Sequence, residues 1–236
     1  CYDLVENYHD KGILAKTRAP AIGTSHLFAK AQASMTTLMN HLDYVGVMAL
    51  ELFVSKDAQG NDYLFVNEIA PRVHNSGHWS IEGAITSQFE NHIRAVVGLP
   101  LGDTDNVHPA ILVNVLGQYP NIKDVLAIDG VHYHSYHKEE RAERKIAHIT
   151  LMPNDVADLE PALAQLVAVL PNKVGLDKKA HLTSTPKDNT KSTVAIEDLP
   201  KIKQAQKVSQ VTEPENMTTD NTLKPNSHIK INKDKK

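Results

Sequence analysis

The residues from 63 to 78 constrain this chain more than any other stretch. Residues 63–66 form an apolar run, Tyr-Leu-Phe-Val, which is typical of a β-strand and leads directly into unlike polar side chains. Residues 67–78 then bring together a carboxylate, a guanidinium, two imidazoles, two amides and a hydroxyl, with Pro71 and Gly77 among them. Proline fixes φ and glycine permits a turn, so this sequence predicts a shaped polar loop rather than a helix. Such a loop on a rigid strand is typical of a ligand site, and the alternative is a surface loop with caps and turns.

A second carboxylate, Glu51, stands seventeen residues before Glu68. It is the single charge in the apolar run 46–54, and a charge in such a run is rarely buried unless it is paired or binds a metal. The Gly, Asn and Asp of residues 56–62 favour a turn, so the two runs predict a β-hairpin. Antiparallel pairing could set Glu51 and Glu68 side by side, where their oxygens would suit Mg²⁺ shared with nucleotide phosphates. The alternative is two unrelated glutamates at strand ends.

A cationic stretch precedes a predicted strand near the end of the apolar part of the chain. Four basic residues fall within eight positions, namely Lys138, Arg141, Arg144 and Lys145. A cationic hairpin tip suits a phosphate group, because Lys and Arg make charge-assisted hydrogen bonds to phosphate oxygens. A solvated loop is the alternative.

Periodicity and turn residues predict the other elements. Apolar residues at three- and four-residue spacing predict helices over 25–42, 80–97 and 155–170, the second with Ser80 as a candidate N-cap. Apolar or alternating runs predict strands at 4–5, 110–117, 130–137 and 146–151. From about residue 178 the composition becomes polar and aromatic residues vanish, so residues 179–236 are predicted to be a disordered tail.

These motifs resemble the N5-carboxyaminoimidazole ribonucleotide synthetase family, the ATP-grasp enzymes of purine synthesis also called the ATPase subunit of phosphoribosylaminoimidazole carboxylase. The resemblance covers roughly residues 1 to 175. It is carried by Glu51 in a Gly-Val-x-x-x-Glu strand and by the runs 67–78, 87–95 and 98–102. It implies an α+β fold with the second half of an ATP-grasp domain at 1–98 and a small β-rich C-terminal domain at 99–178.

The resemblance also implies an activity, the ATP-dependent carboxylation of 5-aminoimidazole ribonucleotide with bicarbonate, via carboxyphosphate, to N5-carboxyaminoimidazole ribonucleotide. Arg72 is then expected to bind bicarbonate as a planar anion, since its guanidinium is a rigid fork. The expected catalytic residues are Arg72, His74, Asn75 and Ser76. The residues expected at ATP are His9, Asn67 and Glu68, with Mg²⁺ held by Glu51 and Glu68. The residues expected at the ribonucleotide phosphate are Lys138, Arg144 and Lys145, followed by His148 in the same family pattern.

Composition narrows the binding partners and the cell compartment that this chain fits. The net charge of −3 gives no basic footprint for nucleic acid or a membrane surface. Cys1 is the sole cysteine, which excludes an internal disulfide framework and fits a reducing compartment. No apolar run reaches membrane-spanning length, so a cytoplasmic protein is expected. The resemblance adds a homodimer for the full-length enzyme.

The resemblance covers only the C-terminal portion of that family. The chain begins at Cys1 and lacks the family's adenine-cradling lysines and glycine-rich lid, and no Walker-type phosphate loop replaces them. The alternative to an active enzyme is therefore a catalytically incomplete fragment that acts only as a nucleotide- or ribonucleotide-binding module.

Overall fold

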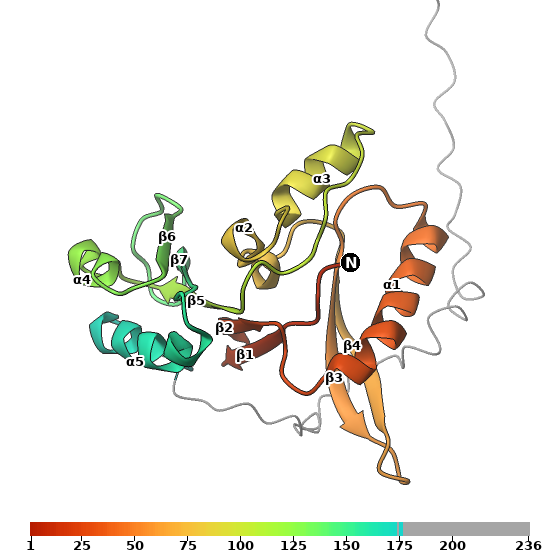
Figure 1. Cartoon of the computed structure of the whole chain (residues 1–236), viewed down its shortest axis with the longest axis horizontal. Helices are drawn as coiled ribbons and strands as arrows, with labels where there is room; N and C mark the ends of the chain where they lie inside the picture. Colours follow the sequence, from red (N-terminus) through yellow and green to blue (C-terminus); the bar gives the residue numbers. More distant parts are fainter. Residues whose placement is uncertain (174, 177–236) are drawn as a thin grey trace, which may run out of the picture. The chain divides into compact units, whose positions relative to one another are not determined.

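Two antiparallel sheets organise the residues that this computed structural model describes, 1–173 and 175–176 (Figure 1). The smaller sheet pairs β3 (Ala49–Lys56) with β4 (Asp62–Ala70). The larger sheet has the strand order β1 (Glu6–Asp10), β2 (Ile13–Ala19), β5 (Ala110–Leu116), β7 (Lys145–Leu151) and β6 (Val131–Ser135). The tail predicted at residues 179–236 lies outside the described residues.

The β3–β4 hairpin confirms the pairing expected from the sequence. Its turn is closed by Asp57, whose Oδ1 accepts hydrogen bonds from the backbone N–H groups of Gln59 at 2.9 Å and Asn61 at 2.8 Å. Glu51 pairs directly with Glu68, and the register then shifts so that Leu52 pairs with Val66. Asn67 is therefore the extra residue of a β-bulge, which bends the strand and re-aims the side chains beside it.

The main core lies around β5, in which every residue is buried. Helix α5 (Leu159–Val169) packs its buried face against β5 and β7, through residues spaced three and four apart, namely Leu159, Ala162, Leu163 and Leu166. Each fully buried leucine contributes roughly 1.5–3 kcal/mol of transfer free energy. The short helix α4 (Ile122–Leu126) contacts both β6 and α5. This core holds the cationic loop between β6 and β7 on a rigid base.

Helix α1 (Phe28–Leu42), preceded by a 3₁₀ turn (Ser25–Leu27), confirms the helix predicted over 25–42. Leu27 and Ala31 form a small core with Leu64 of β4, against which apolar residues of β3 also pack. Asp43 ends the helix in the left-handed conformation, with φ of 48°. None of the described helices is both long and apolar enough to cross a lipid bilayer.

The large sheet joins segments that are far apart in the sequence. β2 pairs antiparallel with β5, with Lys16 opposite Val113 and Ala19 opposite Ala110. Arg18 of β2 also forms an ion pair with Glu160 of α5. The two halves predicted on either side of residues 98 and 99 thus contribute strands to one sheet, and the domain division at that point stays a prediction.

Two local predictions were wrong. The helix expected over 80–97 is two helices, α2 (Ser80–Gly83) and α3 (Gln88–Val96). The chain leaves the helical path at Ala84, which bridges to Asn106, and Ser87 rather than Ser80 caps α3 by accepting from Glu90 N–H. The strand expected at 4–5 begins instead at Glu6, and the Leu4 carbonyl before it accepts a hydrogen bond from the Ala21 N–H at 2.7 Å.

Candidate functional site

The Glu51 carboxylate is the centre of the candidate site. It lies in a cavity of about 360 Å³ bordered by β1, β3 and β4, and its side chain is 11% exposed. Asn67 Nδ2 donates to its Oε2 at 3.2 Å, and Asn7 Nδ2 approaches its Oε1 at 3.4 Å. Thr17 Oγ1 donates to Asn7 Oδ1 at 2.8 Å, which turns the amide nitrogen of Asn7 toward the carboxylate. Charge-assisted hydrogen bonds of this kind hold Glu51 in one orientation.

Two histidines face the same carboxylate from different elements. His9 Nε2 of β1 lies 4.0 Å from Glu51 Oε1, and His74 Nε2 lies 3.9 Å from it. Burial lowers the pKa of both imidazoles, and Glu51 opposes that shift. The Ser76 backbone N–H donates to His74 Nδ1, so the proton of the neutral ring is on Nε2, the atom that faces Glu51.

Lys145, in the cationic stretch 138–145, interacts electrostatically with Glu51 and Glu68. Burial lowers the pKa of its ammonium, while Glu51 and Glu68 raise it. Arg72 and Lys138 act in the same direction as burial. The sequence-predicted metal, bicarbonate and phosphate residues are thus close enough in space to influence the charge of one lysine.

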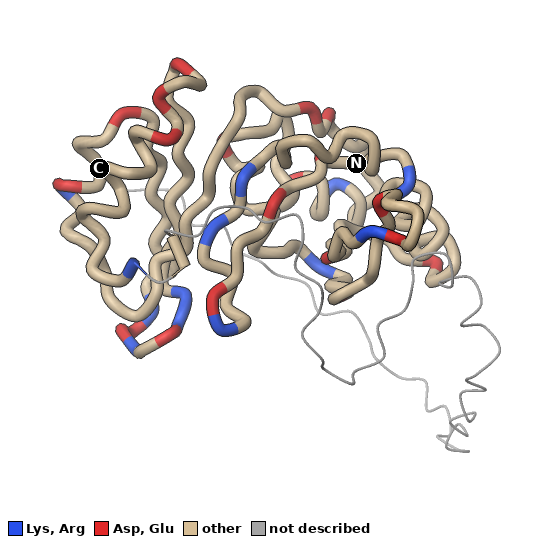
Figure 2. Tube along the Cα trace, turned by 90° about the horizontal axis from the view of Figure 1, so that it is seen from below, with Lys and Arg blue, Asp and Glu red and all other residues tan. Residues whose placement is uncertain are grey.

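The rest of the cationic loop is more exposed. Lys138 lies over the Tyr136 ring, with Nζ 4.9 Å from its centroid, and Arg144 is partly exposed. Figure 2 shows Lys, Arg, Asp and Glu positions scattered among uncharged ones along the described part of the trace, with both signs of charge in view. His148, which follows in the same sequence pattern, is 2% exposed and lies inside the sheet.

The polar loop after β4 has one turn of 3₁₀ helix and is otherwise irregular. Residues Asn75–Gly77 form a 3₁₀ turn, and Gly77 is absent from the residues with positive φ. Glycine is needed there for space, because a Cβ would lie 2.7 Å from Gln88 Oε1. Asn75 exchanges two hydrogen bonds with Asn114 of β5, at 2.9 and 2.6 Å. Arg72 is exposed and donates to the Val73 carbonyl at 3.0 Å.

Three histidines, His78, His134 and His148, form a cluster that the sequence did not predict. His148 stacks on His134 at 4.5 Å between ring centroids, with His78 at 5.2 Å on another side. Tyr136 Oη lies 2.8 Å from His148 Nδ1, while His148 Nε2 is buried without a partner in the described residues. Burial lowers the pKa of His148 to about 3 and that of His78 to about 4, so both rings are neutral near pH 7. These three histidines come from β6, from β7 and from the loop after β4, so no single motif in the sequence brings them together.

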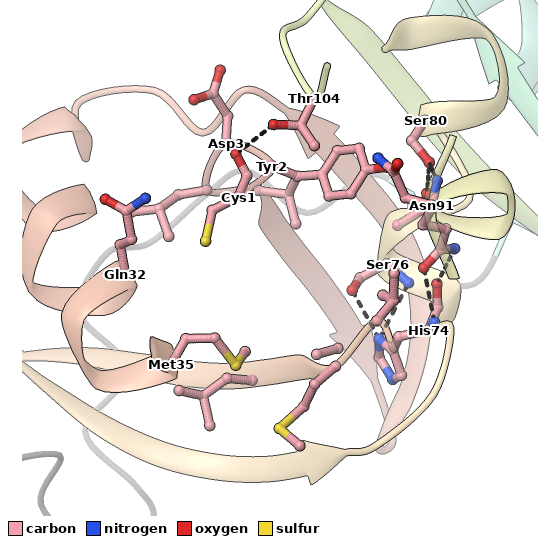
Figure 3. Close-up of a pocket in the computed structure, with 18 of the residues that line it drawn as sticks. Cys1, Tyr2, Asp3, Gln32, Met35, His74, Ser76, Ser80, Asn91 and Thr104 are labelled. Carbon is pink, nitrogen blue, oxygen red and sulfur yellow. Dashed lines mark hydrogen bonds between the residues drawn. The ribbon is translucent and has the colours of Figure 1, made fainter. Parts of the chain in front are cut away.

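A second cavity of about 310 Å³ meets the loop from the other side. Figure 3 shows His74 and Ser76 at one end of it and Gln32 and Met35 of α1 at the other. Gln88 and Asn91 of α3 also border this cavity. Ser76 of the loop lines both cavities, while His74 and Gly77 line only this second one.

The two glutamates fit a magnesium ion by their donor chemistry. Residues paired across an antiparallel hairpin point to the same face, which brings two hard anionic groups together. Magnesium takes one or two carboxylates and completes its shell with water or phosphate oxygens. No group of three or more His, Cys, Asp or Glu side chains in the described part of the chain could hold a metal ion. The pair therefore suits a cation shared with phosphate rather than a closed protein cage.

The fold and the site define an ATP-grasp protein. The ATP-grasp domain model matches residues 1–89, and the phosphoribosylaminoimidazole carboxylase C-terminal domain model matches residues 110–162. N5-carboxyaminoimidazole ribonucleotide synthase of Vibrio cholerae is 46% identical over 172 residues, which cover 73% of this chain and 44% of that protein. The Escherichia coli relative of the same name is 42% identical over 170 residues, covering 72% and 46% of the two chains.

Solved structures agree with these sequence matches. N5-carboxyaminoimidazole ribonucleotide synthetase of Thermus thermophilus aligns with a TM-score of 0.67 and 49% identity, over 72% of this chain and 46% of that one. The Aspergillus clavatus enzyme, solved with ADP and 5-aminoimidazole ribonucleotide, aligns with a TM-score of 0.64 and 30% identity, over 71% and 47% of the two chains. This chain belongs to the N5-carboxyaminoimidazole ribonucleotide synthase family, and it spans less than half the length of the Vibrio cholerae and Escherichia coli relatives.

Proposed function

We propose that this chain supplies part of the active site of an ATP-dependent ligase that carboxylates 5-aminoimidazole ribonucleotide with bicarbonate. The product is N5-carboxyaminoimidazole ribonucleotide, in purine synthesis, and carboxyphosphate is the activated form of bicarbonate. The observation that carries the proposal is the meeting of three groups at Glu51 and Glu68. These are the β1 residues around His9, the loop residue His74, and Lys145 of the cationic loop.

Nucleotide and magnesium are assigned to the hairpin side of the site. Glu51 and Glu68 would hold Mg²⁺, with His9 and Asn67 beside the nucleotide phosphates. The bound ion would neutralise charge on phosphate oxygens. The hydrogen bonds from Asn7 and Asn67 leave the Glu51 carboxylate oriented before any ligand arrives, which reduces the reorganisation that binding requires.

Bicarbonate and ribonucleotide are assigned to the loop side. Arg72 has an exposed guanidinium suited to a planar anion. His74, Asn75 and Ser76 would line the pocket for the carboxyl group and the amine. Lys138, Arg144 and Lys145 would bind the ribonucleotide phosphate, since a phosphomonoester accepts several charge-assisted hydrogen bonds.

The test is phosphate release that depends on the ribonucleotide. It should be measured with ATP, Mg²⁺ and bicarbonate, first for this chain and then for a longer protein that contains it, with Glu51→Gln as the inactive control. Ribonucleotide-dependent release by the longer protein supports the proposal, and its absence there contradicts it. Release by the longer protein alone favours the second candidate for this chain, a ribonucleotide-binding module without turnover.

Two finer assignments accompany the proposed activity. We expect a homodimer for the complete enzyme and a cytoplasmic location, in which bicarbonate and ATP are both available. Sedimentation of the longer protein at several concentrations would measure the first of these.

A further inference from the structure

The side chain of Gln88 connects two histidines of the loop. Gln88 is the first residue of α3 and is 3% exposed. Its Oε1 accepts from the His74 backbone N–H at 3.0 Å, and its Nε2 donates to the His74 carbonyl at 2.8 Å. The same Nε2 lies 2.8 Å from His78 Nδ1. A buried carboxamide thus spends both of its N–H groups and its oxygen on one short loop.

These partners leave only one orientation for the amide. The His74 backbone N–H can only donate and its carbonyl can only accept, so the oxygen of Gln88 must face the former and the nitrogen the latter. The nitrogen therefore also donates to His78 Nδ1, which must be unprotonated in the neutral ring. The N–H of His78 is consequently on Nε2, which leaves that atom as a hydrogen-bond donor.

The surrounding structure holds Gln88 in place. Its backbone N–H donates to Ser80 Oγ at 2.9 Å, and that hydroxyl donates to the Gly77 carbonyl at 2.6 Å. A Cβ on Gly77 would lie 2.7 Å from Gln88 Oε1 and 2.9 Å from its carboxamide carbon. Gly77 must therefore lack a side chain to leave room for the carboxamide of Gln88.

We propose that Gln88 is a positioning residue of the active site, which fixes the main chain of His74 and the Nε2–H tautomer of His78. This role rests on the proposed function, because His74 faces the Glu51 carboxylate at which the reaction components meet. Fixing the main chain of His74 sets where its imidazole reaches, and a misplacement of about 1 Å can lower a rate on the order of a hundredfold.

The test uses histidine ¹⁵N NMR of the chain, which requires no turnover. In the unsubstituted chain His78 should have a bare Nδ1, with a hydrogen-bond coupling to the Gln88 carboxamide nitrogen. Gln88→Glu keeps an acceptor for the His74 N–H but removes the donor, so His78 should move its proton to Nδ1. Gln88→Met removes all three contacts, so the tautomers should mix and the His74 amide should exchange faster. Gln59→Glu in the exposed β3–β4 turn makes the same chemical change without either effect.

A bare Nε2 in the unsubstituted chain overturns the proposal whether or not the variants fold. So does an unchanged His78 tautomer in a folded Gln88→Glu or Gln88→Met. Turnover is then measured in a longer protein that contains the chain, where Gln88→Glu should lower kcat about tenfold or more with little change in the KM for ATP. If the unsubstituted longer protein does not carboxylate the ribonucleotide, the proposed function fails, while the tautomer result still decides what Gln88 holds.

Discussion

At the scale of the residue, the acidic and basic side chains of the site shift one another's pKa values. Lys145 is the clearest case, because burial lowers its pKa while Glu51 and Glu68 raise it. We predict that Glu51→Gln lowers the pKa of Lys145 further, since it removes the larger of the two carboxylate effects and leaves the burial. Titration of ¹³C-labelled lysine by NMR measures this directly. Glu139→Gln, in the exposed part of the same loop, should leave the pKa of Lys145 unchanged, and an equal shift in both variants would contradict the electrostatic influence of Glu51.

Arg72 tests the anion assignment at the same scale. Arg72→Lys keeps the charge but loses the planar fork, so in a longer protein that turns over we predict a large rise in the bicarbonate requirement with little change in ATP affinity. Steady-state kinetics with each substrate varied in turn would separate the two. A fall in ATP affinity with unchanged bicarbonate dependence would place Arg72 at the nucleotide instead.

At the scale of the element, local pattern and long-range contact divide what the sequence could predict. The β3–β4 hairpin, α1 and β5 follow from apolar periodicity and from turn residues, so they were predictable, as was the pairing of Glu51 with Glu68. The break between α2 and α3 depends on a bridge from Ala84 to Asn106, twenty-two residues away, which periodicity cannot report.

Long-range contacts also limited what the sequence could predict about the candidate site. The residue types that meet at Glu51 were visible in the sequence as motifs. The partners that hold them were not, because Gln88 and Asn114 act through contacts with a loop 14 and 39 residues away. Asn114 did leave one clue, since it is a lone amide in an otherwise apolar strand, and a buried polar group of that kind needs a partner.

The start of β6 depends on a glycine. Gly130 has φ of +68°, and a Cβ there would lie 2.3 Å from Pro153 N and 2.4 Å from the Met152 carbonyl carbon. We predict that Gly130→Ala destabilises the chain by about 3 kcal/mol or more, because backbone atoms must move as well as φ. Gly60 has φ of +85°, but a Cβ added there would have nothing within 4 Å, so Gly60→Ala should cost only about 1 kcal/mol. Urea unfolding of both variants gives the comparison, and equal losses would contradict the steric argument.

At the scale of the whole molecule, the histidine cluster makes stability depend on pH. Unfolding returns His78 and His148 to a pKa near 6.5, while burial holds their folded pKa values at about 4 and about 3. The unfolded chain therefore binds more protons, and stability present above about pH 6.5 is lost as pH falls toward 4. Between pH 6.5 and 5 each ring should contribute a loss of about 2 kcal/mol at most.

We predict that His148→Gln, which keeps an acceptor for Tyr136, flattens the fall in the free energy of unfolding between pH 7 and 5. The carboxylates of Asp57 and Asp62, whose pKa values are lowered by hydrogen bonds, act at more acidic pH and do not interfere. His41→Gln on the exposed surface of α1 is the matched control and should retain the full slope. Parallel curves for the parent chain and His148→Gln would remove His148 from the explanation.

The pairing of β2 with β5 has a consequence for how this chain can be divided. Four consecutive residue pairs, from Lys16 with Val113 to Ala19 with Ala110, connect the ATP-grasp part with the C-terminal part. A cut near residue 98 would leave each piece with a raw strand edge whose N–H and C=O groups match those of the other piece. Two such pieces are complementary, because the β2 edge of one can pair with the β5 edge of the other by β-augmentation. We therefore expect two fragments divided there to recombine, as the halves of a split protein do.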